Sequence, residues 1–297
     1  MSSVVSERPN SEVNAGIPGF DRFAWYFLRV SGLALVILAC GHLIITHFIN
    51  VPSDTVFDFV AKRWASPVWR TFDFLLLFFA LWHGILGMRT IITDLVRARG
   101  WRVALNSLMW VIGVVFFALG LVTIFAFDEA QGRANTGPLA DAFWVADVIV
   151  WSLYVFAVLT YVGGLALVVY IARHISLGTR PIYRGDLGQY AWILHRVAGA
   201  GILFFLLVHI LDIMLIGFGR DVYDEAVAVY ANAFLVPMEI ALVGAVFYHT
   251  LNGLRIILIN FSKWGVKRQQ ALFWIAVGLT VVLTGISAWI IVAHEFL

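Results

Sequence analysis

Seven stretches of this chain are long and apolar enough to cross a lipid bilayer, and this feature restricts the possible fold more than any other. A membrane-spanning helix needs about 20 consecutive, mostly apolar residues. Inside the hydrocarbon a helix satisfies its own backbone hydrogen bonds, which water cannot reach. The stretches lie at about 24–49, 70–96, 104–127, 143–172, 190–217, 232–260 and 270–295. The sequence therefore predicts an all-α integral membrane protein with seven transmembrane helices in the lipid bilayer.

The composition excludes several classes of protein. Of the 297 residues, 13% are charged, whereas a soluble domain carries about 25%. The net charge of +2 is too small to suggest a nucleic-acid partner. Cys40 is the single cysteine, so a cysteine-ligated iron–sulfur cluster and a C-x-x-C-H haem attachment are both excluded. Any electron carrier in this chain must be held without a covalent bond.

The distribution of lysine and arginine predicts the orientation in the membrane. If the N-terminus is cytoplasmic, fifteen basic residues fall on the inner side and five on the outer side. Basic residues concentrate on the cytoplasmic side of membrane proteins. We therefore expect a multi-pass protein of the cell (cytoplasmic) membrane, with its N-terminus in the cytoplasm and its C-terminus outside. The polar residues 1–22 are expected to form a cytoplasmic tail.

The chain also contains an internal repeat. In the first and fifth stretches, Arg29 matches Arg196, Gly32 matches Gly199, and His42 matches His209. In the second and sixth, Asp73 matches Glu239, His83 matches His249, Gly87 matches Gly253, Arg89 matches Arg255, and Asp94 matches Asn260. We therefore predict two three-helix units in parallel orientation, at 23–128 and 189–297. Because the second unit must start again on the inner side, 129–188 is expected to supply a loop and one connector helix.

Four of the matched residues are histidines inside apolar stretches, where an ionisable side chain is costly and usually functional. By helix rise, His42 and His209 lie roughly 20 Å from the inner arginines of their helices, and His83 and His249 about 9 Å from theirs. The histidines thus form an outer and an inner layer, each with one residue from each unit. Two imidazoles in one layer can bind a haem iron axially. Hydrogen bonding across helices is the simpler alternative.

Two glycines and one further histidine belong to the same prediction. Gly87 and Gly253 follow the inner-layer histidines by four residues and share their helix face. They leave room either for a flat macrocycle or for a closely packed helix. His47 has no counterpart in the second unit and is an alternative to His42 as a ligand.

The motifs "ILHRVAG" and "YHTLNGLR" of the second unit resemble the larger cytochrome b anchor subunit of succinate dehydrogenase and fumarate reductase. The motifs "LRVSG" and "LWHGILGMRTIITD" of the first unit resemble the smaller anchor subunit. The resemblance covers about 20–127 and 190–297. It implies that both anchor subunits are fused in one chain, with the small type first.

This resemblance implies two haem b groups, one held by His83 and His249 and the other by His42 and His209. The implied haem surroundings are Arg29, Arg196, Gly87, Gly253, Arg89 and Arg255. The candidate quinone contacts are His195, Arg196, Asp94, Trp192, Asp73 and Glu239. Trp192 stands where the family has a serine, which favours menaquinone over ubiquinone and leaves open whether the quinone binds on the inner or the outer side. Asp73 and Glu239 are interpreted either as proton-exchanging groups near an outer quinone or as solvated helix ends.

The leading hypothesis is therefore the haem-bearing membrane anchor of a succinate:quinone oxidoreductase. It would pass electrons from an iron–sulfur subunit to a membrane quinone, while a flavoprotein subunit oxidises succinate. The chain has no glycine fingerprint for a dinucleotide. A stand-alone two-haem transmembrane cytochrome and a parallel-repeat, proton-coupled transporter are the two alternatives. The sequence does not fix whether the complex oxidises succinate or reduces fumarate.

Overall fold

The computed structural model describes residues 18–50, 52–136, 143–177 and 187–296, and within these ranges every regular element is helical. In this part of the chain six helices are long and apolar enough to cross a membrane. They are α1 (Pro18–Ile44), extended by the π-helix η1 (Ile45–Ile49), α3 (Pro67–Leu95), α4 (Arg99–Phe125), α7 (Leu187–Met214), extended by the 3-10 helix η3 (Leu215–Phe218), α9 (Val236–Phe261) and α11 (Gln269–Phe296). Each overlaps one predicted stretch.

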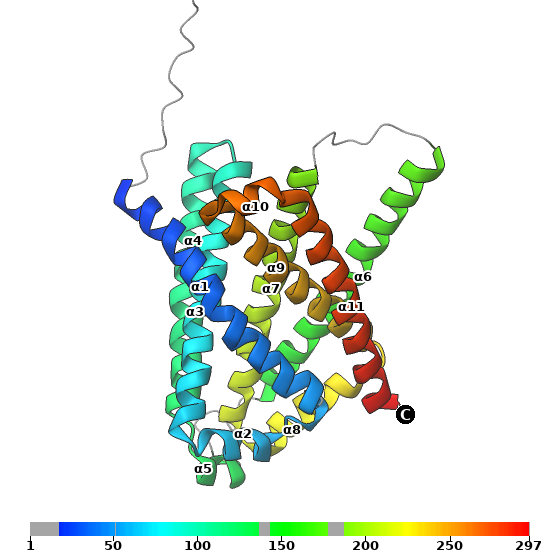
Figure 1. The fold of residues 1–297 in the computed structure, drawn as a ribbon. Helices are drawn as coiled ribbons and strands as arrows, with labels where there is room; N and C mark the ends of the chain where they lie inside the picture. Colours follow the sequence, from blue (N-terminus) through cyan, green and yellow to red (C-terminus); the bar gives the residue numbers. More distant parts are fainter. Residues whose placement is uncertain (1–17, 51, 137–142, 178–186, 297) are drawn as a thin grey trace, which may run out of the picture.

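The predicted connector forms a further helix, α6 (Phe143–Leu177). Its apolar segment, Asp147–Gly163, is shorter than those of the other six, so a seventh membrane crossing remains a prediction. Phe156 and Ala157 of α6 pack against Leu235 and Met238, and the helix then leans away from the bundle (Figure 1). Residues 137–142 and 178–186 of the predicted connector region, and 1–17 of the predicted tail, lie outside the described residues.

The two predicted units occupy the two halves of the bundle. Helix α3 packs against α1 and α4 in the first half, and α9 packs against α7 and α11 in the second (Figure 1). Contacts between the halves are made mainly by α3 with α7, by α4 with α7 and by α1 with α9. The four helices that carry the matched histidines, α1, α3, α7 and α9, therefore surround the centre of the molecule.

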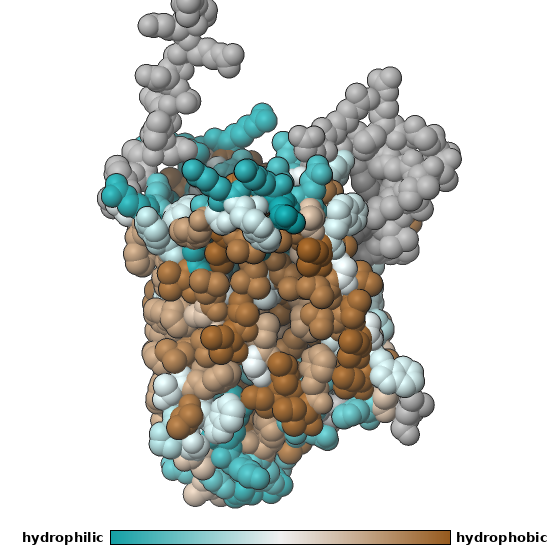
Figure 2. All heavy atoms as spheres, viewed as in Figure 1, coloured by the Kyte–Doolittle hydropathy of each residue, from teal (hydrophilic) through white to brown (hydrophobic). Residues whose placement is uncertain are grey.

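The outer surface of the bundle is apolar. Figure 2 shows hydrophobic residues over the middle of this face and hydrophilic residues at both ends. Ile37, Val122 and Trp289 expose 75%, 64% and 69% of their surface. Large apolar patches of this extent are not stable in water, whereas a bilayer solvates them. The protein is thus a multi-pass integral membrane protein.

Short helices cover the end of the bundle opposite the start of α1 (Figure 1). They are η2 (Pro52–Asp54), α2 (Phe57–Trp64), α5 (Glu129–Arg133), α8 (Arg220–Ala228) and η4 (Val229–Ala231). We call them the cap; it lies on the predicted outer side. At the predicted inner side, α10 (Lys263–Lys267) joins α9 to α11. None of these short helices lies within the apolar stretches predicted from the sequence.

Buried side chains and ion pairs hold the cap together. Residues 57, 60, 61 and 64 of α2 follow the spacing of one helix face, and all four are buried. The carboxylate of Asp58 lies 2.7 Å from both Arg133 of α5 and Arg220 of α8. The Asp224 carboxylate accepts a hydrogen bond of 2.6 Å from the backbone N–H of Phe57 at the start of α2. These contacts close one end of the bundle.

Replacing Gly132 by alanine is expected to destabilise the cap. A Cβ atom there would lie 2.5 Å from two ring atoms of Phe57, which is fully buried. Overpacking of this kind costs roughly 1–3 kcal/mol. The apparent Tm of the purified protein in detergent should therefore fall in Gly132→Ala. In Gly278→Ala, where no other described residue lies within 4 Å of the new Cβ, it should stay the same or rise. Equal Tm values in the two variants would contradict the packing described for α5.

Candidate functional site

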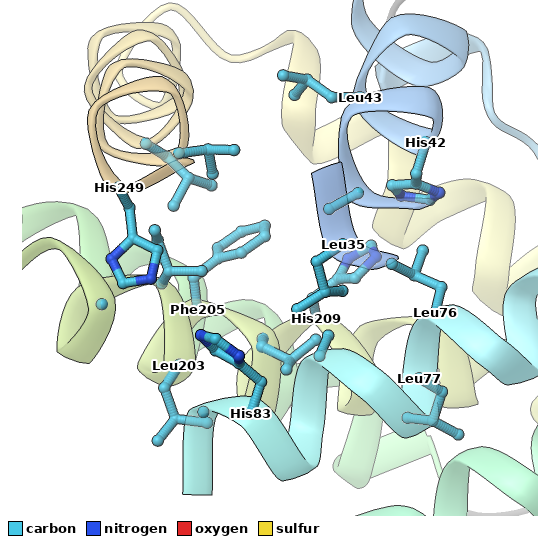
Figure 3. A pocket seen from close by; sticks show the side chains of 18 of the residues that line it. Leu35, His42, Leu43, Leu76, Leu77, His83, Leu203, Phe205, His209 and His249 are labelled. Carbon is cyan, nitrogen blue, oxygen red and sulfur yellow. The ribbon is translucent and has the colours of Figure 1, made fainter. Parts of the chain in front are cut away.

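A cavity of about 840 Å³ runs through the centre of the bundle. Its volume is in the range of ligand and cofactor sites, roughly 300–1,000 Å³. Helices α1, α3, α7 and α9 supply most of its lining, and the cap closes its outer end. All four matched histidines line it, and Figure 3 shows them among leucine side chains and Phe205. The predicted layers are therefore parts of one apolar chamber.

Each predicted layer is a pair of facing histidines (Figure 3). The ring centroids of His83 and His249 are 6.1 Å apart, and those of His42 and His209 are 6.0 Å apart. An imidazole nitrogen binds a transition metal at about 2 Å, so two rings that share one ion have centroids roughly 6 Å apart. In each pair one histidine comes from each half. The spacing of both pairs therefore fits one metal ion between the rings.

Hydrogen bonds orient the inner pair. His249 Nδ1 lies 3.0 Å from the carbonyl oxygen of His195, which can only accept, so this nitrogen carries the proton. His83 Nδ1 lies 2.9 Å from the Ser31 hydroxyl, which donates its own hydrogen to the carbonyl oxygen of Phe27 and must therefore accept from the histidine. In both neutral rings the Nε2 lone pair is left free. Metal-binding histidines characteristically have such a partner on their other nitrogen.

The outer pair is held by packing. The His209 ring stacks on Phe205 at a centroid distance of 5.5 Å and an angle of 13°. The Nδ1 atom of His42 is buried and has no hydrogen-bond partner among the described residues. A buried polar nitrogen without a partner is uncommon in a protein and requires an explanation. A ligand that binds this nitrogen would supply one.

Gly32 and Gly199 match each other in the internal repeat, and no role was predicted for them. Both lie against the inner histidine pair. A Cβ atom on Gly199 would lie 2.7 Å from the His249 ring, and one on Gly32 would lie 3.6 Å from the His83 ring. Of the two predicted glycines, Gly87 has no described residue within 4 Å of the position of a Cβ atom. A Cβ atom on Gly253 would lie 3.5 Å from the ring of His195. In the first half the ring of His83 on α3 thus lies beside Gly32 on α1, and in the second half the ring of His249 on α9 lies beside Gly199 on α7.

The inner end of the cavity carries two arginines. Arg29 Nε and Arg196 Nη1 are buried without a hydrogen-bond partner in the described part of the chain. Each guanidinium lies over a tryptophan four residues earlier, Arg29 at 4.3 Å from Trp25 and Arg196 at 3.6 Å from Trp192. Arg196 also forms an ion pair of 2.5 Å with Asp94. The free N–H groups are suited to an anionic group of a ligand.

His195, predicted as a quinone contact, also lines this end of the cavity. Its ring stacks on His249 with a centroid distance of 3.9 Å and an interplanar angle of 5°. Its carbonyl oxygen accepts the hydrogen bond from the same residue. His195 therefore contacts an inner-layer histidine with both its ring and its backbone.

The remaining predicted arginines do not line the cavity. Arg89 forms an ion pair of 2.6 Å with Asp21, which joins α3 to the start of α1. Arg255 donates to the carbonyl oxygen of Gln269 at 3.1 Å and to the side chain of Asn252 at 3.3 Å. In this structure these two residues connect neighbouring helices at the inner side.

The two matched acids near the outer side both have partners. Asp73 accepts hydrogen bonds from Arg63, the shorter at 2.6 Å, and from the indole N–H of Trp64 at 2.8 Å. Glu239 is only 6% exposed, and its carboxylate lies 2.8 Å from Nδ1 of His47. The structure thus places Asp73 in a contact that holds α2 to α3. Glu239 forms a contact between the two halves.

Asp212 is a further acid at the outer end that the repeat did not point to. It lies three residues after His209, is 2% exposed and lines the cavity. The hydroxyl of Tyr230 donates a hydrogen bond of 2.9 Å to it. The sequence could have indicated this residue, because Asp212 is the single acidic residue in the apolar stretch 190–217.

The fold and the cavity define a class: a duplicated helical membrane protein whose two halves enclose paired histidines. The sequence model of the family described as "Succinate dehydrogenase/Fumarate reductase transmembrane subunit" matches residues 7–122 and again 171–286. The chain therefore belongs to this family and contains two of its units in one polypeptide. It is thus a membrane subunit of an oxidoreductase complex, as the motifs predicted.

Two curated relatives agree with this assignment. The chain is 40% identical over 124 residues to succinate dehydrogenase 2 membrane subunit SdhC of Mycobacterium tuberculosis, a match that covers 41% of this chain and 90% of the relative. It is 26% identical over 97 residues to the succinate dehydrogenase hydrophobic membrane anchor subunit of Halobacterium salinarum, covering 32% of this chain and 74% of the relative.

Removing the Ser31 hydroxyl tests the orientation of the inner pair. With haem bound as the sequence predicts, Ser31→Ala takes away the acceptor that makes His83 a more basic ligand. The midpoint potential of the inner haem should therefore rise, by up to about 40 mV for a hydrogen bond of about 1 kcal/mol. A spectroscopic redox titration measures this. Ser31→Thr should restore the original potential.

The second half offers a matched control for this variant. Ala198 stands at the position equivalent to Ser31, and Nδ1 of His249 already donates to a carbonyl oxygen. Ala198→Ser should therefore leave the potential unchanged. An unchanged potential in Ser31→Ala would show that the serine does not act on His83.

Proposed function

We propose that this chain is the haem b-containing membrane anchor of a succinate:quinone oxidoreductase and passes electrons from a bound iron–sulfur subunit to a membrane quinone. The observation that carries the proposal is the pairing of histidines across the two halves, at ring distances of 6.1 Å and 6.0 Å. Family membership supports the rest, because both relatives are named as membrane subunits of succinate dehydrogenase. Membership of this family also argues against the alternative of a proton-coupled transporter.

Two haem b groups would be held by this chain's own imidazoles. His83 and His249 would hold the inner haem through Nε2, with their rings oriented by Ser31 and by the carbonyl of His195. His42 and His209 would hold the outer one. A bound haem supplies one-electron chemistry at its iron, at a potential that the axial ligands and their hydrogen bonds set. The lining around both positions is mostly apolar.

The residues around the histidines would have supporting roles. Arg29 and Arg196 would pair with the carboxylates of the inner haem, which is consistent with their buried, unpaired N–H groups. Gly87, four residues after His83, has no described residue within 4 Å of the position of a Cβ atom, and Gly253 borders His195. Arg89 and Arg255 would act indirectly, through the helices that they connect.

The partners would dock on the inner side. Arg97, Arg99, Lys263, Lys267 and Arg268 are exposed there, between α3 and α4 and around α10. A basic surface of this kind suits an acidic face of the iron–sulfur subunit, to which the flavoprotein subunit would be attached. At the same side, Trp192, His195, Arg196 and Asp94 form the predicted inner quinone contacts, with menaquinone as the expected quinone. The orientation in the cytoplasmic membrane would have the N-terminus inside.

Single histidine replacements test the two-haem arrangement. His83→Ala should remove the inner haem and leave the outer spectrum largely intact, and His42→Ala should do the reverse. His47→Ala is the control: its ring pairs with Glu239, so two haems should remain. Haem content per polypeptide and reduced-minus-oxidised spectra measure the result. One haem per chain, with His42 and His209 unligated, would contradict the proposal.

Co-purification of flavin and iron–sulfur proteins with this chain distinguishes the proposed membrane anchor from a stand-alone cytochrome.

The connector helix is expected to be dispensable as a covalent link. We propose that α6 crosses the membrane a seventh time only to return the chain to the inner side. Cutting the chain near Gly178, outside the described residues, and co-expressing both pieces should still give a haem-loaded protein. The measurement is haem content after purification through a tag on one piece. Stable insertion of both pieces without haem would show that chain continuity is needed.

A further inference from the structure

A second, smaller pocket lies at the outer end of the bundle, where α2 ends, α3 begins and α4 ends. Its volume is about 340 Å³. The described residues that line it are Trp64, Ala65, Pro67, Arg70, Thr71 and Phe125. Of these, only Trp64 also lines the central cavity. The pocket is therefore separate from the space that holds the histidine pairs.

Arg70 is the single ionisable residue in the described lining of this pocket. Its side chain is half-buried, and its Nε–H group donates a hydrogen bond to the carbonyl oxygen of Trp64 at the end of α2. This bond fixes the direction of the guanidinium group. The two terminal nitrogens of Arg70 have no partner among the described residues.

The arginines of the cap differ from Arg70, because each of them has an acidic partner. Arg63 pairs with Asp73 at 2.6 Å, and the carboxylate of Asp58 lies 2.7 Å from the two other arginines of the cap. Within the described part of the chain, no carboxylate pairs with Arg70. Its positive charge is therefore available to an anion that does not belong to this chain.

The depth of the pocket in the membrane indicates which anion this is. Arg70 lies at the outer end of the apolar stretch 70–96, and Phe125 is the last residue of α4. The Phe125 ring is 54% exposed and contacts Phe74, one turn deeper in α3, at a centroid distance of 5.8 Å. An arginine at this boundary extends its guanidinium group to the level of the lipid head groups. The phosphate groups of phospholipids are the anions found at this level.

An exposed apolar face of α4 continues from the pocket toward the middle of the membrane. Leu108, Val111, Val115, Val122 and Phe125 follow one another at intervals of three, four or seven residues, so they share this face. Each exposes between 48% and 64% of its surface. A lipid acyl chain can pack along these side chains while its phosphate group reaches Arg70. A free phosphate ion would gain nothing from them.

We propose that this pocket binds the head group of an anionic phospholipid of the outer leaflet, with the terminal N–H groups of Arg70 donating to the phosphodiester oxygens. The planar guanidinium group matches two oxygens of a phosphate. An anionic head group is preferred to a zwitterionic one, because no acid in the described lining could pair with an ammonium group. The bound lipid would bridge the cap helix α2 and the pair α3–α4. This site is independent of haem and of quinone.

The test is a lipid titration of the purified, delipidated full-length chain, followed by native mass spectrometry. Dioleoyl phosphatidylglycerol is compared with dioleoyl phosphatidylcholine, which has the same acyl chains. The wild type should bind the first phosphatidylglycerol molecule at least about 5-fold more tightly, because one basic residue near a membrane surface contributes about that much. In Arg70→Gln the ratio of the two Kd values should fall to about 1. Each variant is compared with itself, so a general loss of stability does not imitate this result.

Two further variants sharpen the comparison. Lys62→Gln removes the same charge from an exposed residue at the same end that does not line the pocket, so it should keep the wild-type ratio. Arg70→Lys keeps the charge but loses the planar group, so its ratio should lie between those of the wild type and Arg70→Gln.

Four results would overturn the proposal. They are an unchanged ratio in Arg70→Gln, an equal fall in Lys62→Gln, an adduct of inorganic phosphate, titrated alone, that depends on Arg70, and a second copy of the chain that binds through Arg70 in place of lipid. The last two would appear as distinct masses in the same spectra.

Discussion

Placing four imidazole rings in the interior of a membrane helix bundle is the constraint on which the remaining structure depends. In hydrocarbon, each ring nitrogen needs a partner within the protein or from a ligand. The inner pair obtains one partner per ring from Ser31 and from the carbonyl oxygen of His195. The other nitrogens belong to rings that face each other across the cavity. The long helices therefore converge on a central chamber, and Gly199 lies where any side chain would displace the His249 ring.

Duplication explains how the pairs arise, and divergence between the copies explains how the site differs from end to end. Each half contributes one histidine to each layer, so neither half contains a complete pair. The copies have also become unequal. A hydroxyl supports His83, whereas a backbone carbonyl supports His249. Arg196 has an acidic partner in Asp94, in addition to the tryptophan that lies under it. Such differences between the copies allow two positions in one cavity to have different chemical properties.

The cap shows why local sequence patterns were insufficient at the outer side. Residues 57, 60, 61 and 64 have the spacing of one helix face, but a segment of eight residues is too short to stand out next to spans of more than twenty. Its helix depends on tertiary contacts, since Asp224 caps it from the other half and Asp58 pairs with two arginines distant in sequence. A short helix is not stable by itself.

The sequence by itself determined the helical membrane architecture, the duplication and the pairing of histidines by depth. Hydropathy and helix rise depend only on the order of the residues along the chain. It could not determine the partners of the charged groups. Arg89 and Arg255 connect helices, Asp73 holds the cap, Glu239 bonds to His47, and Asp212 lines the cavity with one oxygen that has no partner among the described residues. Which groups become partners depends on how the helices rotate about their axes and cross one another. Ion pairs and hydrogen bonds form only when the atoms lie within about 3 Å, and the sequence alone does not give such distances.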